Sequence, residues 1–142
     1  MKTFEQLKEQ VTPEIIKKMC ELAEGFSINR ETQNVEYRGI SSYEYFHGTH
    51  RSIVTSWELF PLLLHRAVEG WNNDRIKNCG NSFVHITSDS VYVESGEDIR
   101  SFTGVIETHY SPVEVWDFSD YQPSRLTPCE MAIWDCLLEV LK

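Results

Sequence analysis

Residues 127–142 read TPCEMAIWDCLLEVLK, and this stretch decides how the rest of the chain must pack. Thr127 suits a helix N-cap, Pro128 suits the first helical position, and Glu130 completes a capping box. Beyond the cap, apolar residues occupy more than one side of the predicted helix. Such a helix must be covered, either by the rest of its own domain or by another chain.

Similar start signals predict two helices near the N-terminus. Thr3 to Gln10 is expected to form a short helix. The second is expected to begin at Thr12-Pro13 and to run to about Glu24, because proline is favoured at the first helical position. Gly25 follows as a residue that can end the helix.

A further helix is predicted in the middle of the chain. Thr55 and Glu58 fit a capping box, and apolar residues then recur in three- and four-residue steps. Pro61 either kinks this helix or separates its first turn, because proline donates no backbone hydrogen bond. Gly70 and the pair at 72–73 are expected to mark its end.

Short runs of alternating apolar and polar residues predict strands in two regions of the chain. These runs cover residues 26–30, 35–37, 42–46, 83–87, 91–93, 102–108 and 113–118, with a hairpin turn at 88–90. The predicted fold class is therefore α+β, with an antiparallel sheet packed against about three to four helices. At 142 residues, the chain is expected to be a single globular domain, residues 1–142.

The chain is acidic, with a formal net charge of −9, and most of the excess lies between Asp89 and Asp120. This charge argues against direct binding to nucleic acid or to anionic lipid, both of which require clustered Lys and Arg. An acidic surface keeps a protein soluble, and this is the favoured interpretation. The alternative is an acidic face that meets a basic partner.

The four cysteines show no metal-binding or disulfide spacing and are expected to be free. Reduced cysteines, together with an N-terminus that lacks a signal sequence, predict a cytoplasmic protein. The longest apolar run, residues 59–64, is too short to cross a membrane.

Two kinds of candidate site use histidine. His47 and His50, near Glu44, have a spacing that allows metal binding; the remaining histidines are His65, His85 and His109. A surface loop is the favoured interpretation, because a metal site requires three or four converging ligands. The second candidate is Cys79 as a nucleophile with His85, near Lys77; a loop cysteine without a role is favoured, since its surroundings are acidic. His65 is expected to pair with Glu69 on the same helix.

Two other groups of residues are interpreted as ordinary surface and sheet residues. The carboxylates Glu94, Glu97, Asp98 and Glu107 are expected on an acidic surface. The aromatic residues Tyr43, Tyr45 and Phe46, near Arg38 and Arg51, suit either a platform for stacked bases or sheet packing, and packing is favoured because few basic residues lie nearby.

Residues 60–72 and 126–134 resemble segments of small, uncharacterised proteins from phages and prophage regions. This resemblance implies a bacterial cytoplasm and an accessory role in a mobile element. It assigns no activity and no site residues.

These observations favour a non-enzymatic binding or assembly module with a protein partner, without cofactor or metal. A homodimer through Trp134 and Leu138 of the last helix is one prediction; burial of that helix within its own chain is the other. One alternative function is an acidic decoy for a basic nucleic-acid-binding protein. Another is a small metal- or cysteine-dependent hydrolase.

Overall fold

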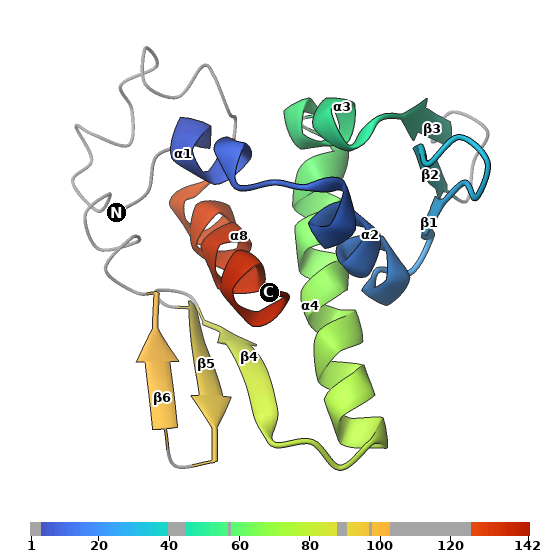
Figure 1. Cartoon of the computed structure of the whole chain (residues 1–142). Helices are drawn as coiled ribbons and strands as arrows, with labels where there is room; N and C mark the ends of the chain where they lie inside the picture. Colours follow the sequence, from blue (N-terminus) through green and yellow to red (C-terminus); the bar gives the residue numbers. More distant parts are fainter. Residues whose placement is uncertain (1–3, 40–44, 57, 88–90, 97, 103–125) are drawn as a thin grey trace.

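The computed structural model describes residues 4–39, 45–56, 58–87, 91–96, 98–102 and 126–142. These segments form five helices and two three-stranded antiparallel sheets (Figure 1). The predicted α+β fold is confirmed, although the strands form two sheets rather than one. Within the described segments, no helix has the length and apolarity that crossing a membrane requires.

The N-terminal half contains two helices followed by the first sheet: α1 (Phe4–Glu9), α2 (Pro13–Leu22), β1 (Phe26–Ile28), β2 (Val35–Arg38) and β3 (Tyr45–Gly48). The Thr12 side chain caps α2 as predicted, accepting a hydrogen bond from the backbone N–H of Ile15 at 3.2 Å. The strands follow one another as an antiparallel meander in the order β1-β2-β3. Gly25 has a φ of 89°, a left-handed conformation suited to glycine.

A short helix, α3 (His50–Thr55), was not expected from the sequence. Its N-cap is Thr49, whose hydroxyl oxygen accepts a hydrogen bond from the Ser52 backbone N–H at 3.1 Å. The predicted capping box at Thr55 and Glu58 is wrong. The Thr55 hydroxyl instead donates to the Ser52 carbonyl inside α3, and Glu58 makes no side-chain cap for the helix that follows.

That following helix is α4 (Leu59–Lys77), and the prediction that it ends near Gly70 is wrong. Gly70 lies where α4 crosses α2, and a Cβ atom on Gly70 would overlap the carbonyl oxygen of Leu22. The glycine is therefore required for close helix packing rather than for helix termination. Pro61 lies in the first turn of α4, where backbone N–H groups have no acceptor within the helix, so it breaks no hydrogen bond.

The C-terminal half contains the second sheet and the last helix: β4 (Ser82–Ile86), β5 (Val91–Ser95), β6 (Asp98–Ser101) and α8 (Pro128–Val140). The β4–β5 hairpin was expected, whereas β6 was not. Of the strand predicted at 102–108, only Phe102 is described, and it lies just after β6; the strand predicted at 113–118 lies outside the described residues. The capping box at Thr127 and Glu130 is confirmed, with both of its hydrogen bonds present.

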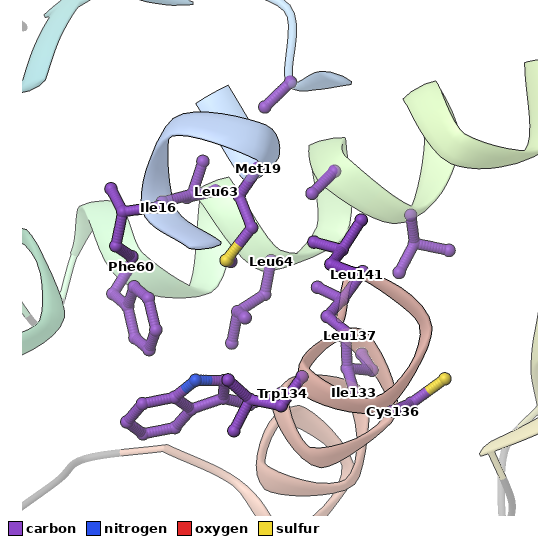
Figure 2. Close-up of a cluster of buried hydrophobic side chains, with 14 of the residues drawn as sticks. Ile16, Met19, Phe60, Leu63, Leu64, Ile133, Trp134, Cys136, Leu137 and Leu141 are labelled. Atoms are coloured by element: carbon purple, nitrogen blue, oxygen red, sulfur yellow. The ribbon is translucent and has the colours of Figure 1, made fainter. Parts of the chain in front are cut away.

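Helices α2, α4 and α8 meet in one apolar core (Figure 2). At its centre, the rings of Phe60 and Trp134 pack edge to face with centroids 4.8 Å apart. Ile16 and Met19 of α2 are fully buried beside them. Figure 1 shows α4 between the first sheet on one side and α8 with the second sheet on the other. The core therefore joins both halves of the chain through α4.

The chain itself covers the apolar surface of α8. Trp134 is 0% exposed and Leu138 is 1% exposed, which is the intrachain burial that the sequence left as an alternative. A homodimer remains a prediction. Among the α8 residues whose exposure the structure describes, those available for such a contact are half-buried: Cys129, Glu130, Met131, Asp135, Glu139 and Val140.

The close crossing of α2 and α4 makes Gly70→Ala a sharp test of the fold. In a free helix, alanine is more favourable than glycine by about 1 kcal/mol. Here we expect the opposite sign, a loss of about 3 kcal/mol in the free energy of unfolding, because the new methyl group must displace the Leu22 backbone. Urea denaturation measures the change, and Glu69→Ala on the exposed side of α4 is the control. Unchanged or higher stability for Gly70→Ala would contradict the close crossing.

Candidate functional site

A groove of about 380 Å³ lies between the C-terminal end of α4, the second sheet and the last turn of α8. Its volume falls within the range of small-ligand and side-chain pockets. It is the strongest candidate site in the described part of the chain, because charged, aromatic and hydroxyl side chains meet there. Its lining residues are Trp71, Arg75, Ser82, Val93, Ser95, Asp98, Ile99, Arg100, Phe102, Glu139 and Val140.

The groove exists because α8 covers only part of one sheet face. On that face Val84 pairs with Val93, and both are buried. Two residues away from this valine pair, Ser82 of β4 pairs with Ser95 of β5. Ser95 in turn pairs with Asp98 of β6, the strand on the other side of β5. The same face therefore changes from valine to polar residues near the end of α8, and its polar end remains open.

Direct hydrogen bonds between α4 and the edge strand β4 fix one wall of the groove. The indole N–H of Trp71 donates to the Ser82 carbonyl at 3.0 Å. The Asn72 side chain makes two bonds to Val84: its amide donates to the carbonyl at 2.8 Å, and its oxygen accepts from the N–H at 2.9 Å. Asn72 thus acts as a neighbouring strand would, satisfying both backbone groups of an edge residue.

Arg75 lies one helical turn after Trp71, and its guanidinium carbon is 3.8 Å from the centroid of the Trp71 ring. Gly80 folds back over it: the Gly80 N–H donates to the Arg75 carbonyl at 2.7 Å, and a Cβ on Gly80 would come within 2.9 Å of the arginine side chain. The Arg75 Nε atom is buried without a hydrogen-bond acceptor among the described residues. Its ion contact with Asp74 is 3.8 Å long, well beyond a charge-assisted hydrogen bond.

The opposite wall contains an arginine with a close acidic partner. Arg100 donates to the Glu139 carboxylate at 2.8 Å, and its guanidinium lies 5.5 Å from the centroid of Phe102. The hydrogen bond from Arg100 lowers the pKa of Glu139. The charge of Arg100 is therefore matched within the groove, whereas the only described carboxylate near Arg75 is the distant one of Asp74.

This arrangement is suited to binding. Val93 and Phe102 form an apolar floor, and the hydroxyl groups of Ser82 and Ser95 lie 3.2 Å apart at its polar end. The lining residues include neither histidine nor cysteine, so no serine of the lining has a histidine base there. Of the lining residues, only Asp98 was a candidate from the sequence. The sequence signal that could have pointed to the groove is the four-residue spacing of Trp71 and Arg75, which places both side chains on the same side of a helix.

The four described histidines lie on four different elements: His47 on β3, His50 on α3, His65 on α4 and His85 on β4. His109 and Glu44 lie outside the described residues. The described part of the chain contains no group of three side chains able to hold a metal ion. Instead, the Nε2 atom of His47 lies 3.7 Å from the Glu36 carboxylate.

Cys79 is exposed in the turn after α4, with a φ of 57°. The proposed partner His85 stacks on Tyr92 with ring centroids 4.8 Å apart, and its Nε2 atom lies 3.6 Å from the Glu94 carboxylate. The described interactions of His85 are therefore with β5. Two other cysteines, Cys20 and Cys136, are buried, and burial raises their pKa values to about 12, which makes them poor nucleophiles.

The remaining sequence candidates fall in different places. Of the four carboxylates, Glu94 faces His85 and Asp98 lines the groove, whereas Glu97 and Glu107 lie outside the described residues. Tyr45 is exposed and points away from the core, while its neighbour Phe46 packs against the core, so the two rings cannot form one stacking platform. Tyr43 and most of the acidic stretch between Asp89 and Asp120 also lie outside the described residues.

His65 contacts Glu130 of α8, with its Nε2 atom 3.7 Å from the carboxylate. Interaction with Glu130 raises the pKa of His65, against the smaller effect of burial. The predicted partner Glu69 acts on His65 through a smaller charge interaction, which also raises the pKa of His65. For Glu130, burial raises the pKa, but His65 and the Thr127 cap together outweigh it and lower the pKa. Glu130 thus serves both the cap of α8 and the contact with α4.

No protein-family model, curated protein or solved structure matches this chain.

The His65–Glu130 pair predicts a pH-dependent contribution to stability. Because the folded pKa of His65 is raised above 6.5, its contribution is complete below that pH and is lost as pH rises through the folded value. Because the folded pKa of Glu130 is lowered below 4.5, its contribution is present above 4.5 and is lost in stronger acid. We expect His65→Gln to lower the free energy of unfolding by less than about 1 kcal/mol, with the largest effect between about pH 5 and 6.5.

Urea denaturation across pH measures this effect, in a double-mutant cycle with Glu130→Gln, which retains a capping-box side chain. In the Glu130→Gln background, the pH-dependent effect of His65→Gln should be much smaller, because only burial and the charge of Glu69 still act on the histidine. The same pH dependence in both backgrounds would exclude the pair as its source.

The link between α4 and β4 makes a second prediction. Asn72→Asp replaces the amide donor with a carboxylate oxygen that faces the Val84 carbonyl. We expect a loss of about 2 kcal/mol in the free energy of unfolding, because a hydrogen bond is lost and two acceptors are brought together. The matched control is Asn73→Asp, the same change at the exposed neighbouring position. Equal stability of the two variants in urea denaturation would show that Asn72 does not support the groove wall.

Proposed function

We propose that this protein is a non-enzymatic binding or assembly module, and that the groove between α4, the second sheet and α8 is its binding surface for a protein partner. The observation that supports the proposal most directly is the pairing of an apolar floor with an arginine, Arg75, that has no close acidic partner among the described residues. Concave apolar sites with a few polar groups are the usual form of a binding site. An accessory role in a mobile element is part of this proposal and rests on the sequence resemblance alone.

The proposal is tested by photocrosslinking from the rim of the groove. Ile99 lines the groove and is 66% exposed, while Ile76 is 67% exposed and is not among the lining residues. Replacing each in turn with p-benzoylphenylalanine gives two probes of nearly equal exposure. In cells that express the chain, we expect position 99 to form one dominant adduct with a protein that mass spectrometry identifies, and position 76 to form none.

The identified protein is then purified and titrated against the chain. Ser95→Arg places a long side chain in the groove, and Ser27→Arg makes the same change at an exposed position of β1. We expect Ser95→Arg to weaken binding about tenfold or more, equivalent to at least about 1.4 kcal/mol, and Ser27→Arg to leave it unchanged.

Equal adducts from positions 99 and 76, or equal binding by the two arginine variants, would rule out the groove as the binding surface. An adduct of two copies of this chain would identify the partner as a second copy. The homodimer would then form through the groove rather than through α8.

A further inference from the structure

We infer that the groove recognises a carboxylate next to an apolar side chain in an extended segment of its partner. This inference rests on the proposed function, because it assumes that the groove is the binding surface. It goes further by naming the chemistry of the bound segment. The carboxylate can belong to an aspartate or glutamate side chain or to a chain terminus, since both present the same two oxygens.

The preference for a carboxylate follows from the two arginines of the groove. Arg100 already has a carboxylate of Glu139 at 2.8 Å. Within the part of the chain that the structure describes, Arg75 has only Asp74 at 3.8 Å, and the other oxygen of that carboxylate accepts a hydrogen bond from the Asn78 amide at 3.1 Å. Stacking on Trp71 also removes one face of the Arg75 guanidinium from water. A partly desolvated guanidinium with a distant counter-ion favours an incoming carboxylate, which it can bind through two parallel hydrogen bonds.

The preference for an apolar neighbour follows from the floor. Val93 and Phe102 are each 7% exposed and lie between the two arginine walls. A cavity of about 380 Å³ accommodates one or two side chains, so an aliphatic residue beside the carboxylate can fill it. Placing an aliphatic side chain against this floor removes the apolar surface of that side chain from water, which favours binding.

The groove also gives the bound segment a direction. Arg75 lies on the α4 side, while Ser95 and Asp98 lie on the side of β5 and β6 and are exposed. Their oxygens can accept hydrogen bonds from backbone N–H groups of an extended segment. The carboxylate should therefore lie toward α4 and the backbone N–H groups toward β6. This order separates the incoming carboxylate from Asp98, and solvent screening weakens the remaining repulsion.

The test uses three small probes on the whole chain: N-acetyl-leucyl-aspartate amide, its neutral isostere N-acetyl-leucyl-asparagine amide, and N-acetyl-leucine with a terminal carboxylate. Nitrogen-15 NMR follows the Trp71 indole N–H and the Arg75 Nε–H, two groups in the α4 wall. We expect the aspartate probe to shift both signals and to bind about tenfold more tightly than the asparagine probe. N-acetyl-leucine tells whether a chain terminus also serves as the carboxylate.

A matched pair of variants places the effect on one residue. Arg75→Gln removes the guanidinium, and Lys77→Gln removes one positive charge from the same exposed end of α4 outside the groove lining. We expect Arg75→Gln to abolish the preference for aspartate over asparagine, and Lys77→Gln to preserve it. The comparison of probes on the unaltered protein needs no variant, so it stands even if Arg75→Gln unfolds.

The inference is overturned if neither carboxylate probe, the aspartate probe nor N-acetyl-leucine, binds more tightly than the asparagine probe, or if the preference for a carboxylate is unchanged in Arg75→Gln. If a partner crosslinks from Ile99 while the probes show no carboxylate preference, the proposed function stands and this inference fails. If the carboxylate probes bind through Arg75 while no partner crosslinks, the groove is a carboxylate site and the protein-binding function fails.

Discussion

The packing of α8 against α4 is the interaction on which the rest of the structure depends. Trp134 and Phe60 meet edge to face, and the apolar residues around them leave water almost completely. Helix α8 also contacts β5 and α1, so the same helix joins the second sheet to the N-terminal helices. The Lys18 side chain of α2 donates to the Leu141 carbonyl at 2.9 Å, which places a positive charge at the end of α8 where free carbonyl groups gather.

The groove is a consequence of where α8 ends relative to the second sheet. Under the helix, the sheet presents buried valines; near its end, the same face presents serine and aspartate. The side chain of Asn72 attaches α4 to the edge of that sheet and holds Trp71 and Arg75 beside the open end. The buried residues of the core and the residues that line the groove therefore lie on the same elements rather than in separate regions.

The number of histidines suggests a metal site, but the contacts of three of them have a structural explanation. Three of them each lie 3.6 to 3.7 Å from a glutamate on a neighbouring element: His47 with Glu36, His65 with Glu130, and His85 with Glu94. Each pair places a histidine against a carboxylate across two strands or two helices. In a chain with a net charge of −9, such neighbours reduce repulsion between carboxylates whenever the histidine is protonated.

The sequence by itself determined the α+β class, the Thr12 and Thr127 caps, the β4–β5 hairpin and the need to cover α8, because caps, turns and periodicity act over a few residues. It misplaced the ends of α4, since Gly70 has the same local signature whether it ends a helix or allows α2 to approach. Only the tertiary structure decided that α8 is covered by its own chain, that His65 meets Glu130, and that Arg75 and Arg100 face one groove. These outcomes depend on contacts between residues far apart in the chain, whose burial and pairing no local pattern specifies.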